Sequence, residues 1–146
     1  MTYSIKDVSN ISGFSIFTIR FYDKEGLLPF VSRNKSGKRV FTESDVAMIR
    51  TISCLKNTGM PIKDIKKYID YCMEGAENIA LRLELLLEHR KGILVHIQTL
   101  HENLKVIDSK IEIYSSPRAV EIINAQRRYV EEEKRENCLQ NPYAEM

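Results

Sequence analysis

The sequence predicts a mainly α-helical protein, in which a helix-turn-helix unit with a small β wing precedes one long coiled-coil helix. Three observations predict this architecture. Two short capped helices are joined by a glycine-containing turn within residues 4–26, and a hairpin pattern rich in basic residues follows at 33–41. An aliphatic heptad pattern then runs from residue 79 to residue 111.

The first two helices are predicted from the signals at their ends. Ser4 and Asp7 form a capping pair at the start of the first helix, and Gly13 ends it. The second helix begins at Ser15 and runs to Gly26, which can adopt the left-handed conformation that closes a helix. Two short helices joined by a tight turn make a helix-turn-helix.

Helical periodicity stops after the second helix, and residues 33–41 predict a short hairpin with basic residues at and beside its tip. Thr42 and Asp45 form a second capping pair, which opens a helix that continues to Gly59. Pro61 suits the first turn of a fourth helix. The residues of these two helices that are expected to face inward are Val46, Ile49, Ile52, Leu55, Ile62, Ile65 and Ile69.

The stretch after Gly75 carries seam residues at alternating spacings of four and three. A seam kept over this length predicts a coiled coil, and a helix with such a stripe needs a partner. The most economical partner is the same helix of a second chain, so we expect a homodimer. The predicted dimerisation positions are Ile79, Leu83, Leu86, Arg90, Ile93, Ile97, Leu100, Leu104, Ile107 and Ile111.

Arg90 is the charged residue in this seam, and two interpretations of it stay open. A buried Arg90 can set orientation or register by meeting Glu84 or Glu88 of an antiparallel partner. Alternatively, its side chain snorkels from the edge of the seam into water. Leu87 and Leu94 widen the stripe in its first half, which suggests that this half also packs on another element, such as the preceding helix.

These patterns divide the chain into three parts. Residues 1–74 form the winged helix-turn-helix with its helical pair, and residues 75–115 form the coiled-coil dimerisation helix. Residues 116–146 form a short helix, opened by Ser116 and Pro117, and a tail without periodicity that is expected to fray.

The composition predicts a small cytoplasmic protein with a polyanionic partner. A chain of 146 residues that is 43% hydrophobic can bury one modest core. No apolar run approaches the roughly 18 residues of a membrane span, and no secretion signal is predicted, so no membrane partner is expected.

Residues 1–72 carry 12 Lys and Arg against 7 Asp and Glu, whereas residues 73–146 carry 10 Lys and Arg against 13 Asp and Glu. The basic half points to nucleic acid, with an ordinary mixed charged surface as the alternative.

Several segments together resemble the MerR family of bacterial transcription regulators, and they are SIKDV (4–8), GFS (13–15), TIRFYDKEGLLP (18–29), GKRVF (37–41) and LKNTGMPI (55–62). The resemblance is close from residue 3 to about residue 72, and the long helix matches in position and type. It implies a homodimer held by an antiparallel coiled coil and bound to a palindromic promoter in double-stranded DNA. Such regulators bend and underwind an over-long promoter spacer, which makes RNA polymerase an indirect partner.

DNA contacts are expected at the start of the second helix and in the wing. Ser15, Phe17 and Thr18 are expected to face the major groove together with Arg20, which reads a base or a phosphate. Tyr22 is expected to give its hydroxyl to a phosphate. Core packing is the alternative interpretation for the aromatic residues of this helix. The wing residues expected to neutralise the DNA backbone are Arg33, Lys35, Lys38 and Arg39.

The odd number of cysteines predicts free thiols, and Cys54 is the one with a possible sensing role. It resembles the single cysteine of the branch of the family that responds to aldehyde and nitrosative stress. Arg50 and Lys56 could favour its thiolate, which would react with an electrophile. The alternative is a small buried hydrophobic residue. Cys72 and Cys138 are weaker candidates for a sensing cysteine.

No metal, cofactor or catalytic site is predicted. The loop at residues 114–118 has no thiol or imidazole for a soft metal. His89, His96 and His101 flank the seam. An inter-chain metal site built from them is one interpretation, but we favour the other, that they are solvated polar side chains. The sequence shows no phosphate loop, catalytic triad or zinc signature, so no enzyme is predicted. The remaining alternative is a coiled-coil architectural or adaptor protein without effector sensing.

Overall fold

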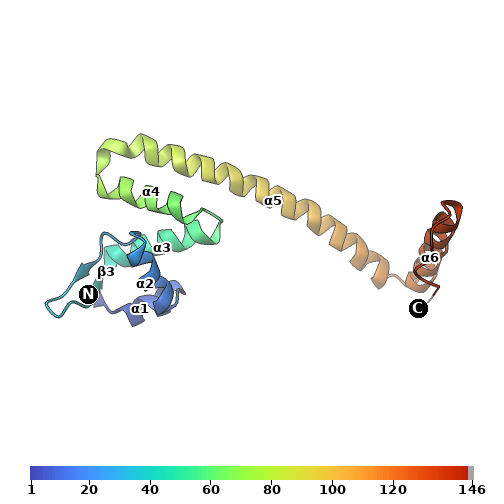
Figure 1. Cartoon of the computed structure of the whole chain (residues 1–146), viewed down its shortest axis with the longest axis horizontal. Coiled ribbons are helices and arrows are strands. Elements are labelled where there is room, and N and C mark those ends of the chain that lie inside the picture. The colour runs from blue at the N-terminus through green and yellow to red at the C-terminus, as the bar shows by residue number, and fades with distance from the viewer. Residues whose placement is uncertain (145–146) are drawn as a thin grey trace. The chain divides into compact units, whose positions relative to one another are not determined.

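The computed structural model describes residues 1–144, and Figure 1 labels its α-helices and strand β3. The chain divides into two compact units, residues 1–94 and residues from Val95 onward, and each is described by itself. The elements in chain order are β1 (Thr2–Tyr3), α1 (Ile5–Ser12), α2 (Ile16–Lys24), β2 (Ser32–Arg33), β3 (Arg39–Thr42), α3 (Glu43–Asn57), α4 (Ile62–Met73), the 3-10 turn η1 (Ala76–Asn78), α5 (Ile79–Ser115) and α6 (Ala119–Glu136).

The helix-turn-helix is confirmed, and its end signals act as predicted. The Ser4 hydroxyl accepts a hydrogen bond from the Asp7 amide, while the Asp7 carboxylate accepts one from the Ser4 amide at 2.8 Å. These hydrogen bonds favour the ionised carboxylate, so the pKa of Asp7 lies below its ordinary value. Gly13 closes α1 with a φ of 78°, and Ser15 caps α2. Satisfying the free backbone groups at both ends makes two short helices stable in this context.

The wing is a three-stranded antiparallel sheet in the order β1-β3-β2. Ser32 pairs with Val40 and Arg33 with Arg39, which confirms the predicted hairpin. β1 was not predicted, because a strand of two residues is too short to show an alternating pattern. Its pairing of Tyr3 with Phe41 ties the start of the chain to the wing.

The core of the first unit contains residues from α1, α2, α3, α4 and β3 and from the turns between them. The inward positions of α3 and α4 are occupied as predicted, since Ile52, Ile65 and Ile69 are fully buried, although Ile62 is only partly buried. Burying one such side chain stabilises the fold by about 1.5–3 kcal/mol. The buried apolar residues are Val8, Phe14, Ile19, Tyr22, Leu27, Leu28, Phe41, Val46, Ile49, Ile52, Leu55, Met60, Ile65 and Ile69.

The first turns of α5 belong to this unit, which therefore extends beyond residue 74, the boundary expected from the sequence. Leu85 and Leu86 pack against the core formed by the shorter helices. The prediction that the first half of the stripe packs on another element is therefore confirmed, although Leu87 and Leu94, which suggested it, are themselves 55% and 48% exposed. Arg82 fixes the turn before α5, where its guanidinium donates to the Tyr71 carbonyl at 2.9 Å.

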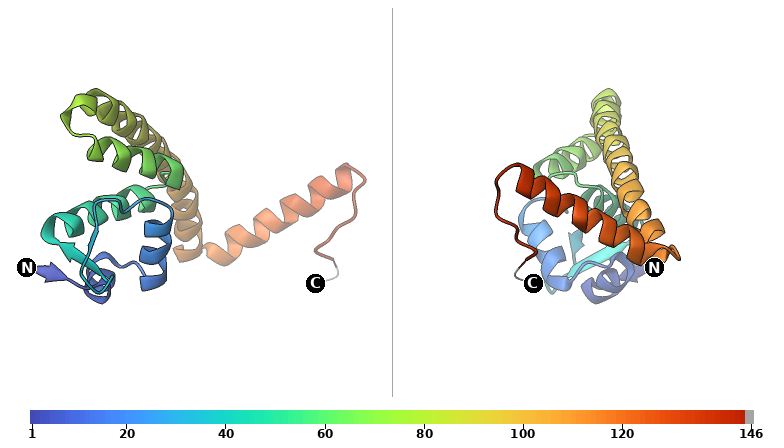
Figure 2. Two further views of the ribbon diagram at one scale, coloured as in Figure 1. Left: turned by 60° about the vertical axis from the view of Figure 1, so that its left-hand side comes forward. Right: turned by 90° about the vertical axis from the view of Figure 1, so that its right-hand side faces the viewer.

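The second unit holds the rest of α5 and all of α6. The predicted C-terminal helix is confirmed as α6. The tail from residue 137, for which the sequence predicts fraying, turns back along α6 (Figure 2), and Arg127 donates to the Tyr143 carbonyl at 2.8 Å. Glu145 and Met146, also part of that tail, lie outside the described residues. Within residues 1–144, no helix is both long and apolar enough to cross a membrane.

Candidate nucleic-acid interface

The first turns of α2 present polar and aromatic groups to solvent. The Ser15 hydroxyl accepts from the Thr18 amide at 3.0 Å and lies 2.9 Å from the Thr18 hydroxyl. Phe17 is 79% exposed, so core packing is wrong for this residue. Arg20 is also exposed, and residues three positions apart share one face of a helix. Phe17 and Arg20 therefore offer an apolar ring and a guanidinium on one surface.

Tyr22 does not have the environment that its predicted role needs. Its side chain is 2% exposed, and its hydroxyl is buried without a hydrogen-bond partner among the described residues. The ring packs edge-on against Phe14, with ring centroids 5.2 Å apart. The prediction that Tyr22 gives its hydroxyl to a phosphate was wrong for this structure, because the side chain is part of the core. Helical periodicity alone did not separate it from Phe21, which is 40% exposed.

The tip of the wing is a tight turn built on Asn34. Its side-chain oxygen accepts from the amides of Ser36 and Lys38 at 3.1 and 3.0 Å. Gly37 has a φ of 81°, a left-handed conformation that favours glycine. The turn projects its lysines outward, and Lys35 and Lys38 are both exposed. The Asn34 contacts thus fix the backbone from which these two lysines project.

A cleft of about 420 Å³ lies between the start of α1, α2 and the wing. Five basic side chains line it, and they come from elements that are distant in sequence. Such a cleft concentrates positive potential and attracts a polyanion. The lining residues are Ser4, Ile5, Lys6, Arg20, Arg33, Gly37, Lys38 and Arg39.

Two residues of this region were missed by the sequence analysis. Lys6 lines the cleft from the first turn of α1, and its place beside the predicted Ser4 cap could have indicated it. Asp23 lies at the end of α2, and its carboxylate is 2.6 Å from Arg39 Nε and 3.5 Å from an Arg33 Nη. Nothing in the local sequence joins Asp23 to residues 10 and 16 positions away.

Cys54 is exposed on the last turns of α3, so the interpretation as a buried hydrophobic residue was wrong. Its carbonyl accepts from the Thr58 hydroxyl at 2.7 Å. Lys56, one of the two cations expected to favour a thiolate, has its ammonium 5.8 and 6.0 Å from the ring centroids of Phe14 and Tyr22. The thiol is accessible to a small reagent, and Lys56 has aromatic partners of its own.

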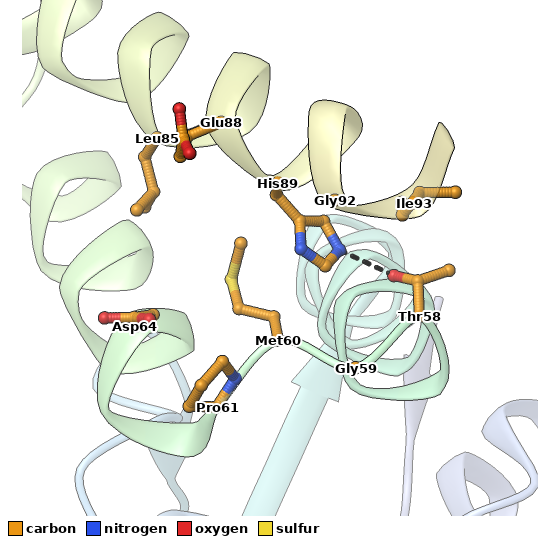
Figure 3. Close-up of a pocket in the computed structure, with 10 residues that line it drawn as sticks. All are labelled: Thr58, Gly59, Met60, Pro61, Asp64, Leu85, Glu88, His89, Gly92 and Ile93. Atoms are coloured by element: carbon orange, nitrogen blue, oxygen red, sulfur yellow. Dashed lines mark hydrogen bonds between the residues drawn. The ribbon is translucent and has the colours of Figure 1, made fainter. Parts of the chain in front are cut away.

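A second cavity, of about 340 Å³, lies between the turn after α3 and the first half of α5 (Figure 3). His89 Nε2 lies 2.7 Å from the Thr58 hydroxyl oxygen, so this histidine is a structural contact between α5 and the turn after α3. Among the described residues, no group of three or more His, Cys, Asp or Glu side chains is arranged to hold a metal ion.

The predicted dimerisation positions fall into two groups. Leu86 and Ile93 are half-buried within the first unit, and Leu86 packs against its core. Arg90 and the other seam residues are exposed, which leaves an apolar face of α5 without a partner in the single chain. The exposed apolar members are Ile79, Leu83, Ile97, Leu100, Leu104, Ile107 and Ile111.

Comparison with known proteins identifies the family. The sequence profile described as "MerR HTH family regulatory protein" matches residues 3–72. A helix-turn-helix-type transcriptional regulator of Haemophilus influenzae is 38% identical over 125 residues, which cover 86% of this chain and 93% of that protein. This chain belongs to the MerR family. The resemblance stated from the sequence motifs is thus confirmed.

Two crystal structures of MerR-family proteins are similar to this chain. A regulator from Bacillus thuringiensis has 45% sequence identity and a TM-score of 0.71, over 77% of this chain and 98% of that one. HiNmlR, described as a MerR family regulator lacking the sensor domain and bound to promoter DNA, has 39% identity and a TM-score of 0.75, over 82% and 94%. The MerR-family chain is a transcriptional regulator and not an enzyme.

Proposed function

We propose that this chain binds a palindromic promoter as a homodimer and controls transcription by deforming the promoter spacer. The single observation that carries the proposal is the cleft of about 420 Å³ lined by five basic side chains at the helix-turn-helix and wing. The DNA-bound HiNmlR structure, 39% identical to this chain, supports the same partner. RNA polymerase is an indirect partner, through the shape of the promoter.

The residues of α2 and the wing divide the work of DNA binding. Phe17 and Arg20 share an exposed face of α2 and enter the major groove, with Ser15 and Thr18 at the helix start. Contacts to base edges specify sequence, whereas contacts to phosphates position the protein. Tyr22 is left out because its hydroxyl is buried. The residues assigned to phosphates are Lys6, Arg33, Lys35, Lys38 and Arg39.

The unpartnered face of α5 supports the homodimer. Leucine and isoleucine side chains such as Leu100 and Ile107 are about half exposed in the single chain, where they would contact water. Pairing this face with a second copy removes it from water, and apolar burial is the main driving force of association. Two DNA-binding units at a fixed separation can grip the duplex on both sides of a spacer and hold it bent and underwound.

The DNA-binding assignment is tested with a fluorescent duplex that the wild-type protein selects from a random-sequence library. Lys38→Ala is expected to weaken binding to all duplexes alike and to reduce the slope of log affinity against log salt by about one. Arg20→Ala is expected to relax sequence preference. Lys67→Ala, which removes an exposed cation from α4, is the matched control. Wild-type protein that selects no duplex, or three variants with equal effects, would refute the assignment.

Cys54 is the part of the proposal that concerns an effector. The exposed thiol adds across the carbonyl of an aldehyde, forming a carbon–sulfur bond while the oxygen takes up the proton, and this step needs no oxidant. The adduct changes packing at the end of α3 and so repositions the DNA-binding unit on α5. Cys54→Ser is expected to abolish aldehyde induction of a reporter, whereas Cys72→Ser is not. Unchanged induction in Cys54→Ser removes this assignment.

A further inference from the structure

Asp23 is the shared acceptor for two arginines that face each other across the wing. Arg33 on β2 and Arg39 on β3 are register partners in the antiparallel pair. The Asp23 carboxylate, on the last turns of α2, accepts from Arg39 Nε at 2.6 Å and from Arg33 at 3.5 Å. One carboxylate therefore links α2 to both strands of the hairpin, β2 and β3.

The position of this carboxylate has two electrostatic costs. An acidic side chain near the C-terminal end of a helix opposes the helix dipole. A negative charge beside the basic cleft also repels DNA phosphates. The two arginines offset these costs, and their like charges would otherwise repel each other across the strand pair.

The Asp23–Arg39 contact is partly shielded from water. The side chains of the two residues are 23% and 20% exposed, and the contact is a charge-assisted hydrogen bond of 2.6 Å. Arg33 is held a second time, because it donates to the Gly37 carbonyl at 2.7 Å. Both guanidinium groups are thus fixed before any ligand arrives.

We propose that Asp23 is a positioning residue for DNA binding, which orients the Arg33 and Arg39 guanidinium groups toward the phosphate backbone and fixes the wing to α2. This inference rests on the proposed function. Arg39 gives its Nε to Asp23, and its two terminal amino groups have no hydrogen-bond partner within residues 1–144, so they are free to donate to a phosphate. A side chain that is already ordered loses less conformational entropy on binding.

The alternative role of Asp23 makes the opposite prediction. If the carboxylate acts only as a charge that repels DNA, its removal strengthens binding at low salt, and the gain fades as salt rises. If it positions the arginines, its removal weakens binding although a repelling charge is lost. The sign of the effect therefore separates the two roles.

The experiment compares Asp23→Ala with Glu25→Ala in the full chain. Glu25 is exposed at the same end of α2 and has no ion pair among the described residues. Its replacement therefore removes one negative charge without breaking an ion pair. Affinity for the duplex selected by the wild type is measured across a range of salt concentrations. Asp23→Ala is expected to weaken binding on the order of five- to tenfold at every salt concentration, and Glu25→Ala to leave it equal or slightly stronger.

A second measurement needs no DNA. Trypsin cuts after Arg33, Lys35, Lys38 and Arg39, and Asp23→Ala is expected to speed cleavage in the wing of the free protein, while Glu25→Ala is not. If Asp23→Ala does not fold, as judged by circular dichroism, Asp23→Asn replaces it, because Asn keeps one acceptor without the charge.

The outcomes separate this inference from the proposed function. Equal affinities and equal wing cleavage in the Asp23 and Glu25 variants overturn the inference, as does tighter binding by Asp23→Ala. Wild-type protein that binds no duplex overturns the proposed function, and faster wing cleavage in Asp23→Ala would then leave Asp23 as a residue that orders the wing without a role in DNA binding.

Discussion

The Thr58 hydroxyl oxygen lies 2.7 Å from Nε2 of His89, which joins the turn after α3 to α5 (Figure 3). The same hydroxyl donates its proton to the Cys54 carbonyl at 2.7 Å. Because that proton is used, the oxygen accepts from His89, whose Nε2 carries the hydrogen. The carbonyl of Cys54 and the long helix are therefore two hydrogen bonds apart.

Replacing His89 by Ala is expected to lower the free energy of unfolding by about 1 kcal/mol, since the hydrogen bond between α5 and the turn after α3 is lost. The measurement is urea unfolding at a fixed protein concentration. His96→Ala is the control, because His96 is exposed on the same helix and makes no hydrogen bond within the described residues. Equal unfolding midpoints for the two variants would contradict a structural role for His89.

The pKa of Asp7 gives the first helix a dependence on acid. Hydrogen bonds from Ser4 hold this pKa below its model-peptide value of 3.8. A carboxyl group whose pKa is lowered on folding stabilises the folded state above its unfolded pKa, and this contribution is lost as pH falls through the folded pKa. Wild-type stability is expected to fall more steeply below about pH 4 than that of Asp7→Asn, which does not titrate. Parallel curves from acid titration of the two proteins would refute the argument.

Two adjacent leucines of α5 are expected to act in different ways. Leu86 is half-buried against the core, whereas Leu87 is 55% exposed. Leu86→Ala is expected to lower stability by about 1–2 kcal/mol at any protein concentration, less than for a fully buried leucine. Leu87 lies directly beside the seam and widens its apolar stripe, so Leu87→Ala should lower stability only at concentrations where dimers form. Urea unfolding at low and high concentration distinguishes them, and an identical concentration dependence would contradict this assignment.

Elements with signals at their ends were predictable from the sequence. Ser4 with Asp7 and Thr42 with Asp45 are reciprocal capping pairs, and both form the hydrogen bonds that their spacing predicts. The information lies within four consecutive residues, so no knowledge of the rest of the fold is needed. The heptad stripe of α5 was predictable for a similar reason, because its spacing repeats along one helix.

Contacts between distant segments were not predictable in this way. The widened stripe predicts that the first half of α5 packs on another element, but the pattern cannot say which side chains make the contact. Leu85 and Leu86 pack on the core, whereas Leu87 and Leu94 are exposed. Tyr22 was misplaced because its burial depends on Phe14 from the preceding turn. The Asp23 contacts with the wing likewise depend on how α2 and the hairpin meet, which no local pattern encodes.

The exposed seam of α5 yields a decisive test of the dimer. Ile97→Asp or Leu100→Asp places a charge in the face expected to meet a second copy, where burying it without a partner is costly. Sedimentation is expected to show a single chain for either variant at micromolar concentration. Affinity for the selected duplex should fall by roughly a hundredfold or more, because two linked half-site contacts become independent ones.

Val106→Asp is the matched control for these seam variants. Val106 is 62% exposed on the same helix but lies outside the alternating seam positions, so the substitution adds the same charge to the same element. It is expected to leave both sedimentation and DNA affinity unchanged. If Ile97→Asp and Leu100→Asp also sediment as the wild type does and keep its affinity, the α5 face is not the dimer interface, and the fixed spacing of two DNA-binding units needs another origin.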